Sequence, residues 1–399
     1  MRCLRVLFVT GRVPGGGPRG DQVRARAHLV ELARRHRITL LTVGDQERRR
    51  DEWLQQICEN IVYVPHDWLA AGIGAVRSLA SGVPLQVAAF STLRLMAAAQ
   101  QLLAGTAFDL VHLQLARLGP LAECVPPEIP VTVDFVDALS VNMQRRAALD
   151  RWPLSAIARR EARLLGNYEQ KLAEFVAGSC AASNSDRAYL GGESKVHQVA
   201  NGVDVSAFAF VPPIARPATF SVVFVGNLGY FPNVDAICWF VDAVWPRVKQ
   251  HFGDVTLQLV GARPHRRLLA LASRENSISL VGPVDIVQPI LAAATVAIAP
   301  LRAGSGQQLK VLEAMACGTP IVASRMAADA VQACDGQHLL IADDAVTFAN
   351  QVVRLLSDRS LRSRLAEEAH RFVTMNFTWQ RSAIALEKLW VETARAREV

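Results

Sequence analysis

A lysine and a glutamate at the start of a predicted helix are the residues whose types and spacing most clearly suggest chemistry. The apolar run 296–301 predicts a buried strand, and Gly304-Ser305-Gly306 predicts a tight loop after it. We expect a helix to open near Gln307 and to carry Lys310 and Glu313. Because these two residues are three positions apart, they lie on neighbouring faces of one helical turn.

This order of elements is typical of an anion-binding site. Backbone N–H groups and the positive end of the helix favour phosphate, and Lys310 adds a full positive charge. Glu313, one turn deeper, is placed to hold hydroxyl groups. A phosphate site beside a hydroxyl site suits a sugar nucleotide. The donor-binding residues that we predict, here and in the loop after the strand 221–225, are Glu313, Gly226, Asn227, Gly304, Ser305, Gly306, Gln307, Gln308 and Leu309.

A second glycine-rich loop follows the first predicted strand, residues 4–10. Its spacing is neither G-x-G-x-x-G nor a Walker A motif, so it indicates neither a regular dinucleotide site nor a P-loop. The loop nevertheless follows a strand of a predicted parallel sheet, where open α/β sheets bind ligands; a merely flexible loop is the alternative. We predict a phosphate- or acceptor-binding loop made of Gly16, Gly17, Arg19, Gly20, Asp21 and Arg24, with Asp137 from a later strand end.

His112 and Asp137 come near the ends of two further predicted strands, 110–113 and 131–135. We place His112 at the edge of the sheet and predict a catalytic role for it, with a structural histidine as the alternative. Strand alternation sends Asp134 and Asp137 to opposite faces, so they do not form an obvious acid–base pair. For each of them, helix capping or an arginine partner is the alternative.

The composition indicates a folded protein of two domains. The chain has 399 residues, of which 51% are hydrophobic and 20% charged. The most apolar stretch, 286–301, is interrupted by Gln288 and Pro289, and the first residues read as a strand rather than a signal peptide. The seven cysteines are dispersed and odd in number, which suggests reduced thiols in the cytoplasm, and the nine histidines show no metal-ligand spacing. We therefore expect no metal.

The net charge of +7 comes from an excess of arginine around residues 34–50, 145–163 and 263–267. These stretches lack the interleaved aromatic residues of a nucleic-acid surface, and no DNA-binding motif is present, so we expect no nucleic-acid partner. Anionic lipid headgroups and phosphorylated substrates explain the balance equally well. Solvated helix faces are the alternative for most of these arginines.

Apolar runs alternate with amphipathic segments along both halves of the chain, which predicts parallel sheets covered by helices. The proline-rich segment 208–218 interrupts this alternation and reads as an interdomain linker. The predicted domains are an N-terminal Rossmann-like domain, a linker, a C-terminal Rossmann-like domain and a last helix that packs back on the first domain, at residues 1–207, 208–218, 219–375 and 376–399 respectively.

Several of these motifs together resemble the retaining glycosyltransferases of family GT4. The matches are Asn201-Gly-Val-Asp204, Val225-Gly226 and the run 312–322, Leu-Glu-Ala-Met-Ala-Cys-Gly-Thr-Pro-Ile-Val. A narrower likeness is to bacterial sugar transferases of exopolysaccharide and PEP-CTERM gene clusters. It rests on residues 20–24, 133–137, 232–240, 299–302 and 308–310.

The resemblance implies a GT-B fold, in which two Rossmann-like domains face a central cleft. The C-terminal domain would bind a nucleotide sugar, and the N-terminal domain would bind the acceptor. Glu313 matches the second glutamate of the family's E-x7-E motif, which holds ribose hydroxyls, whereas Ser305 replaces the first glutamate. The family's basic pair is absent, so Arg302 and Lys310 are the nearest cations for the diphosphate. His112 is the surviving histidine of an H-x-H-like element.

We therefore predict a retaining hexosyltransferase that uses a UDP- or GDP-linked sugar and no cofactor or metal. The predicted catalytic residues are Lys310, Arg302 and His112. The acceptor is lipid-linked, a polysaccharide or a small molecule, and we expect a cytoplasmic protein with peripheral contact to the inner membrane. Two alternatives remain open: a nucleotide-sugar 2-epimerase on the same fold, and a non-catalytic GT-B-like subunit that binds a partner enzyme.

Overall fold

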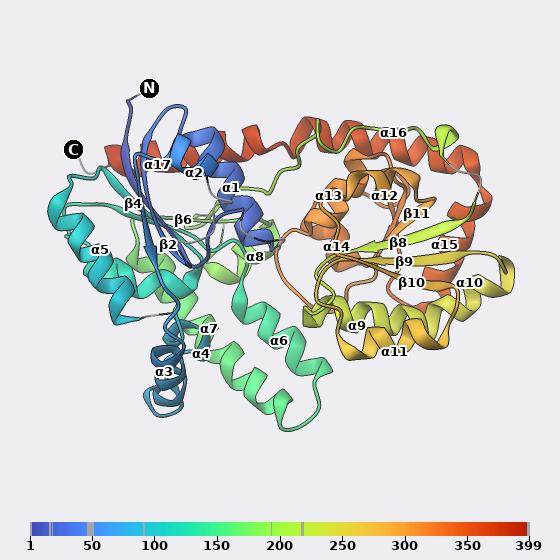
Figure 1. Cartoon of the computed structure of the whole chain (residues 1–399), viewed down its shortest axis with the longest axis horizontal. Helices are drawn as coiled ribbons and strands as arrows, with labels where there is room; N and C mark the ends of the chain where they lie inside the picture. Colours follow the sequence, from blue (N-terminus) through green and yellow to red (C-terminus); the bar gives the residue numbers. More distant parts are fainter. Residues whose placement is uncertain are drawn as a thin grey trace. The chain divides into compact units, whose positions relative to one another are not determined.

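The computed structural model describes residues 2–15, 17, 19–45, 52–90, 92–192, 194–216 and 219–396. The chain divides into two compact units (Figure 1). The first comprises Met1–Ala200 and Trp379–Val399, and the second comprises Asn201–Thr378. Within the described ranges, no helix is both long enough and apolar enough to span a bilayer.

The first unit is built on a parallel sheet in which seven described strands follow the order β3-β2-β1-β4-β5-β6-β7. The strands are β1 Arg5–Thr10, β2 Arg37–Val43, β3 Asn60–Val64, β4 Leu110–Gln114, β5 Val131–Asp134, β6 Gly178–Ala181 and β7 His197–Gln198. Strand β1 is almost continuously apolar because both faces of the sheet are covered. Val6 and Phe8 join the core on one face, and Leu7 and Val9 join the core on the other.

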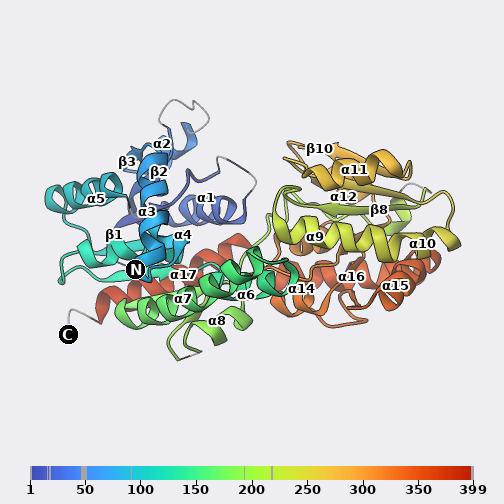
Figure 2. The same cartoon turned by 90° about the horizontal axis from the view of Figure 1, so that it is seen from below.

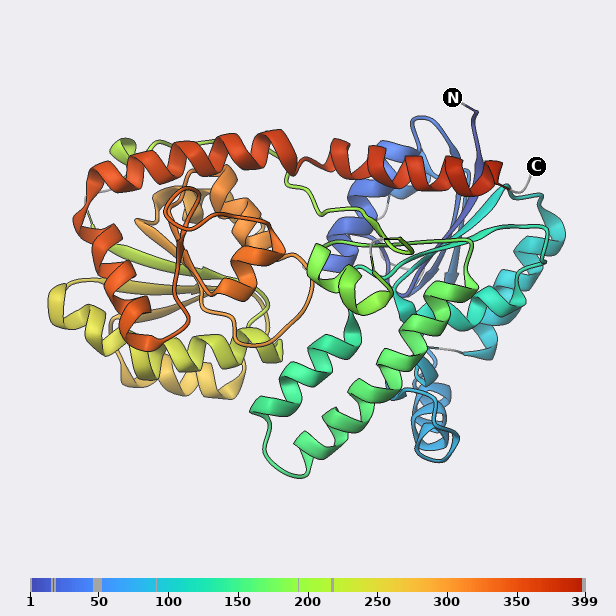
Figure 3. The same ribbon diagram turned by 180° about the vertical axis from the view of Figure 1, so that it is seen from behind.

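Helices cover both faces of this sheet. They are α1 Gly20–Leu32, α2 Glu52–Ile57, α3 Trp68–Ser81, α4 Leu85–Ala88, α5 Leu93–Gly105, η2 Ala116–Cys124, α6 Leu139–Leu149, α7 Leu154–Phe175, α8 Asn184–Leu190 and α17 Trp379–Arg395. Helix α17, the last of the chain, lies beside α1 (Figures 1 and 3). It buries Leu386, Leu389 and Trp390 in the same core as Phe8. Helix α17 is thus an integral part of the first unit.

The second unit repeats this plan with six described strands in the order β10-β9-β8-β11-β12-β13. They are β8 Ser221–Val225, β9 Thr256–Val260, β10 Ile278–Gly282, β11 Val296–Ala299, β12 Ile321–Ala323 and β13 Leu340–Ile341. The helical segments are η3 Pro213–Ala215, α9 Phe231–Trp239, η4 Phe240–Val244, α10 Trp245–His251, α11 Arg266–Arg274, α12 Gln288–Ala293, α13 Leu309–Ala316, α14 Arg325–Ala330, α15 Ala345–Ser357 and α16 Arg359–Asn376. Helices α9 and α11 lie on one face of the sheet, and α12 and α13 on the other (Figures 1 and 2).

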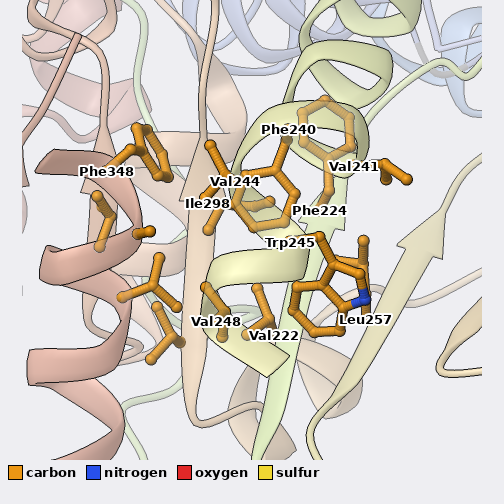
Figure 4. Packing of buried hydrophobic residues seen from close by; sticks show 14 of the residues in the cluster. Val222, Phe224, Phe240, Val241, Val244, Trp245, Val248, Leu257, Ile298 and Phe348 are labelled. Carbon is orange, nitrogen blue, oxygen red and sulfur yellow. The ribbon is translucent and has the colours of Figure 1, made fainter. Parts of the chain in front are cut away.

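Aromatic side chains fill the core between β8, η4 and α15. Phe240 lies 5.7 Å from Phe348 and 5.9 Å from Trp245, measured between ring centroids (Figure 4). Trp245 is fully buried, and its indole N–H donates a hydrogen bond of 3.0 Å to the Ser277 hydroxyl. This core fixes the strand β8, whose last residues lead into the predicted donor loop.

The division between the units falls between Ala200 and Asn201, before the predicted linker. The described part of that linker, 208–216, is bound to the second unit. The backbone N–H of Val211 donates to the Cys317 carbonyl at 3.1 Å. The Arg216 guanidinium donates to four carbonyl groups and to the Thr319 hydroxyl. The segment therefore belongs to the fold of the second unit, and its last two residues, 217 and 218, lie outside the described residues.

Two glycines allow the ends of β8 and β9 to approach closely. A Cβ atom on Gly261 would lie 1.8 Å from the Gly226 carbonyl oxygen, well inside contact distance. Gly261 also has a φ of +149°, which side chains rarely adopt. The backbone N–H of Gly226 donates to the Val260 carbonyl at 3.0 Å. The loop after β8 can therefore take its position only without a side chain at position 261.

We expect Gly261→Ala to destabilise the protein by on the order of 3 kcal/mol, because the new methyl group would displace the Gly226 carbonyl. Gly253→Ala is the matched control, since a Cβ at Gly253 meets nothing within 4 Å; it should change stability by less than about 0.5 kcal/mol. The measurement is guanidinium-induced unfolding of both variants. Equal stabilities of the two variants would contradict this account of the glycine.

Candidate functional site

The predicted donor residues lie where the strand order of the second sheet reverses. Strands β8 and β11 are neighbours in this sheet, but the chain continues from β8 to β9 on one side and from β11 to β12 on the other. In open α/β sheets, ligands bind outside the carboxyl ends of the strands at such a point. Helices α9 and α13 begin there, and their N-cap residues, Tyr230 and Gln308, make no side-chain capping hydrogen bond. Both helix ends thus leave backbone N–H groups without a side-chain cap.

Lys310 links three elements of this site. Its ammonium group donates a hydrogen bond of 2.6 Å to the Asn233 amide oxygen on α9. The Asn233 amide nitrogen in turn donates to the Asn227 carbonyl at 2.9 Å, in the loop after β8. Lys310 Nζ also lies 4.5 Å from the centroid of the Phe224 ring, at cation–π distance. The structure therefore holds the lysine of α13 against the end of β8 and the first turn of α9.

The electrostatics of Lys310 and Glu313 suit an anionic ligand that carries hydroxyl groups. Burial lowers the pKa of Lys310 to about 7, partly offset by Glu313. Burial also raises the pKa of Glu313 to about 7, and Lys310 opposes this. In the described part of the chain, no donor is hydrogen-bonded to the Glu313 carboxylate. A bound phosphate would favour the charged lysine, and hydroxyl groups would supply the donors that the carboxylate lacks.

The glycine-rich loop between β11 and α13 is held by hydrogen bonds where it meets α13. Gly304 and Gly306 have φ values of 109° and 72°, so the loop path requires residues without side chains. The Gln308 amide donates to the Ser305 carbonyl at 3.2 Å. The Gln307 amide oxygen accepts a hydrogen bond of 2.6 Å from the Asn201 backbone, whereas its amide nitrogen is buried without a partner. Gln307 thus retains an unused donor at this loop, and Leu309 begins α13.

Arg302 lies in this loop, but its charge is already paired. Its guanidinium donates two hydrogen bonds to the Asp235 carboxylate, at 3.0 and 2.7 Å. It also lies 5.7 Å from the Trp239 ring centroid. These contacts hold the loop against α9. The ion pair with Asp235 positions the loop, and the catalytic role of Arg302 stays a prediction.

The predicted phosphate loop of the first unit also has its charges paired. Arg24 and Asp134 form an ion pair of 2.6 Å in which neither side chain is exposed. Arg24 also donates to the Val199 carbonyl at 2.7 Å. Asp21 accepts a hydrogen bond of 2.6 Å from Arg12. Arg24 is therefore a core residue and not a phosphate ligand, which corrects its assignment, because its guanidinium is needed to neutralise Asp134.

The remaining residues of that loop lie at the start of α1. Arg19 is the N-cap of this helix and makes no side-chain cap, and Gly20 is its first residue. Gly17 precedes them, and its position is close to the Gln22 side chain. Gly16 lies outside the described residues. The open end of α1 follows β1, which is next to β4 at the point where the order of the first sheet reverses.

Two strained residues mark the same edge of the first sheet. Leu115, directly after β4, has a φ of 83°, and Val136, after β5, has a φ of 63°. A branched residue such as valine is rarely found in this region, and such strain is concentrated at functional sites. Asp137 follows Val136 and is partly buried, with its backbone N–H donating to the Phe135 carbonyl at 2.7 Å. Asp137 thus lies at the edge that the fold offers to a ligand.

His112 is not at that edge. It is the middle residue of β4 and has no exposed surface. The indole N–H of Trp390 donates to His112 Nδ1 at 3.1 Å, and the Phe8 ring lies 4.7 Å away. Because an indole only donates, Nδ1 must accept and the ring is neutral. We therefore correct the predicted catalytic role: His112 is a core residue that holds α17 on the sheet.

The sequence analysis did not assign two residues that the structure brings to the donor loops. Asn233 holds Lys310, and Asn201 holds the backbone of the glycine-rich loop. Both were visible only as parts of motifs, as a residue after Pro232 and as a turn residue before Gly202. Their partners are 77 and 106 residues away in the chain, so no local signal identified them.

The comparisons with known proteins concern the family and the fold. Residues 219–358 match the model of the family described as glycosyl transferases group 1. A phosphatidyl-myo-inositol mannosyltransferase from Mycobacterium leprae is 30% identical over 208 residues, which are 50% of this chain and 54% of that protein. The chain spans about half the length of the curated relatives it matches.

Two solved structures are similar over almost the whole chain. Sucrose-phosphate synthase from Thermosynechococcus elongatus has a TM-score of 0.75 at 17% identity and covers 98% of this chain and 100% of its own. HepE from Anabaena, in complex with UDP and glucose, has a TM-score of 0.72 at 16% identity with the same coverage. The chain therefore has the GT-B fold, and residues 219–358 of its second unit match the glycosyl transferases group 1 model. The predictions of fold and of a glycosyltransferase family are confirmed, while the exopolysaccharide gene cluster stays a prediction.

The neutral state of His112 predicts a pH-dependent contribution to stability. Burial lowers the pKa of this histidine from 6.5 to about 4, although Asp134 opposes the effect. Between these values the unfolded chain binds a proton that the folded chain does not, so the contribution of His112 is lost as the pH falls through this window. His112→Gln keeps an acceptor for Trp390 but does not titrate.

We expect the stability advantage of the wild type over His112→Gln to shrink by on the order of 2 kcal/mol between pH 7 and pH 5. The comparison cancels the titrating groups that do not interact with His112. Guanidinium unfolding at the two pH values measures it. An advantage that is constant with pH would show that His112 does not titrate as the buried ring requires.

Proposed function

We propose that this protein is a retaining glycosyltransferase that moves a sugar from a nucleoside-diphospho-sugar to an acceptor. The observation that carries the proposal is the pair Lys310 and Glu313 on α13, beside a glycine-rich loop at the point where the sheet order reverses. The family match of the same segment supports it. The complex of the similar HepE with UDP favours a uridine nucleotide, with a GDP-linked donor as the other choice.

In this proposal, residues of the second unit bind each part of the donor. The loop 304–306 and the first turn of α13 bind the diphosphate through backbone N–H groups, and Lys310 adds its charge. Glu313 accepts hydrogen bonds from the ribose hydroxyls. Gln307 offers its unpartnered amide nitrogen to the ligand. Gly226 and Asn227 lie at the end of β8 beside Lys310, since a Cβ at Gly226 would lie 3.2 Å from Lys310 Nζ.

The chemistry of the proposal depends on the leaving group. As the bond between the anomeric carbon and the diphosphate breaks, negative charge grows on the diphosphate, and Lys310 and the helix end stabilise it. The acceptor oxygen forms the new bond on the same face, and its proton passes to a diphosphate oxygen. No pair of carboxylates at glycosidase separation was identified in the sequence, so the proposal names no enzymatic nucleophile.

We propose that the acceptor binds to the first unit. Arg19, Gly17, Gly20 and Asp137 lie at the strained edge after β1, β4 and β5. The similarity to a phosphatidyl-myo-inositol mannosyltransferase favours a lipid-linked acceptor, at the cytoplasmic face of the inner membrane. A polysaccharide intermediate is the other acceptor that this proposal allows. The 2-epimerase and the non-catalytic subunit are not favoured, because the family and the named relatives are glycosyltransferases.

Two substitutions on α13 should have different kinetic effects. Lys310→Ala removes charge that acts most strongly in the transition state, so we expect kcat to fall on the order of 10²-fold or more. Glu313→Gln weakens ribose binding equally in ground and transition states, so we expect mainly a higher KM for the donor. Steady-state kinetics with the donor varied separates the two effects.

Lys249→Ala is the control for the loss of a lysine, because Lys249 lies on α10 and pairs with Glu275 at the end of α11. It should leave kcat and KM unchanged. If the Lys310→Ala protein folds and turns over like the wild type, Lys310 does not stabilise the leaving diphosphate, and the proposal loses its main support.

A bound nucleotide should stabilise the protein against heat. At a concentration about 100 times its Kd, a ligand that binds only the folded state adds about 3 kcal/mol to stability. We expect UDP or GDP to raise the melting temperature, and Glu313→Gln to reduce the shift more than Lys249→Ala does. Thermal melts with UDP, GDP and ADP measure this. If none of them shifts the melt of the wild type, the donor assignment fails.

A further inference from the structure

Helix α17, which lies beside α1 (Figure 1), is held by histidines from three different parts of the first unit. The three pairs are His28–Ser382, His36–Glu387 and His112–Trp390, at 2.8, 3.1 and 3.1 Å. All three histidines are buried. The first unit contains five histidines in all, so most of its imidazole rings lie under this one helix. Imidazole is the side chain that most readily changes its charge near neutral pH.

The hydrogen bonds around His28 determine its protonation state. The Ser382 hydroxyl donates its hydrogen to the Ala200 carbonyl, so its oxygen must accept from His28 Nε2–H. In the neutral ring, Nδ1 then carries no hydrogen. This Nδ1 is buried and has no hydrogen-bond partner in the described part of the chain. A proton on Nδ1 would therefore place an unpaired N–H group and a positive charge in the core.

His112 excludes a second proton for a related reason. Its Nδ1 accepts from the Trp390 indole, so a proton there would face a group that can only donate. Burial lowers the pKa of both His112 and His28. Arg24 lowers both pKa values further and Asp134 opposes it, but these two charges are paired with each other. A charge on His112 also lowers the pKa of His28, so the two rings resist protonation together.

The contact of His36 is of a different kind. Its Nδ1 accepts from the Leu4 backbone N–H at 3.2 Å, and its Nε2 donates to the Glu387 carboxylate. Glu387 also pairs with Arg35 at 2.9 Å. The contact therefore contains an ion pair whether or not His36 carries a second proton. We count only His28 and His112 as acid-sensitive contacts of α17.

His28 also supports the segment by which the chain leaves the first unit. The chain passes between the units after Ala200 and again after Thr378. Ser382, near the start of α17, bonds to the Ala200 carbonyl and receives the hydrogen bond from His28. Within the first unit, one hydroxyl thus holds both of these chain ends together. Loss of the bond from His28 would weaken both.

We propose that α17 is an acid-sensitive latch: proton uptake by His28 and His112 releases it from the first unit before the rest of that unit unfolds. Release exposes both rings to water, where they bind protons that the docked state excludes. The docked state therefore loses stability as the pH falls below about 6.5, the value for a free histidine. At neutral pH, the apolar side chains Leu386, Leu389 and Trp390 keep the latch closed. This inference goes beyond the proposed function, because it involves neither donor nor acceptor.

The test measures amide hydrogen exchange of the full chain at pH 7 and pH 5, without nucleotide and after correction for the intrinsic exchange rate. Each of the two histidines should raise the opening equilibrium constant of α17 about 20-fold between these pH values, so we expect an increase on the order of 10²-fold. Helix α15 of the second unit contains no histidine and is the internal reference. Its opening should change by about threefold or less.

A double variant identifies the groups that bind the protons. His28→Gln/His112→Gln keeps a donor for Ser382 and an acceptor for Trp390, but neither side chain titrates. We expect its α17 opening to change by less than about fivefold between pH 7 and pH 5. His197→Gln alters an exposed histidine of the same unit and is the matched control, which should keep the wild-type pH dependence. If the double variant does not fold, the wild-type comparison of α17 with α15 decides the proposal by itself.

Three outcomes would overturn the proposal. One is an equal pH dependence of α17 and α15. Another is exchange of α17 and β1 that rises in a single step, because the whole first unit would then unfold together. The third is a folded double variant with the wild-type pH dependence, because other groups would then bind the protons. Nucleotide binding is tested separately by the thermal melts with UDP and GDP, so failure of the latch and failure of the donor assignment are distinguishable.

Discussion

The hydrogen bond between the Lys310 ammonium group and Asn233 is the interaction on which the second unit's site depends. It joins α13 to α9, and through Asn233 to the loop after β8. The loop must carry a glycine for this to happen, since a Cβ on Gly226 would lie 2.9 Å from Asn233 Nδ2 and 3.2 Å from Lys310 Nζ. Burying a cation with a neutral amide partner costs free energy, which the surrounding core has to offset. A phosphate ligand would remove that cost.

The two units use the same strand order but distribute their charges differently. In the first unit, Arg24 of α1 and Asp134 of β5 form a fully buried pair, and the Trp390 indole donates a hydrogen bond to His112. Such a buried pair adds little net stability, but the loss of either partner would leave an uncompensated charge. In the second unit, Lys310 and Glu313 are left without an opposite charge in direct contact. The second unit thus leaves this lysine and this glutamate on α13, in the segment that matches the glycosyl transferases group 1 model.

Local signals explain what could be predicted. The strand before Gly304, the loop and the start of α13 were all within a few residues of their predicted places, because glycine and apolar runs act through the backbone nearby. The prediction of His112 at a sheet edge was wrong for a physical reason as well. Periodicity indicates that a residue is in a strand, but it does not reveal a helix arriving from 278 residues later to cover that strand.

The sequence by itself determined two parallel α/β units and the placement of Lys310 and Glu313 on one helix after a glycine loop, since these follow from the order of neighbouring residues. Only the tertiary structure decided which of the candidate charges stay available. Arg24 meets Asp134 across 110 residues of chain, and Arg302 meets Asp235 across 67. Pairing of charges depends on distance in space, and the folded chain brings together residues whose separation in sequence carries no information about that distance.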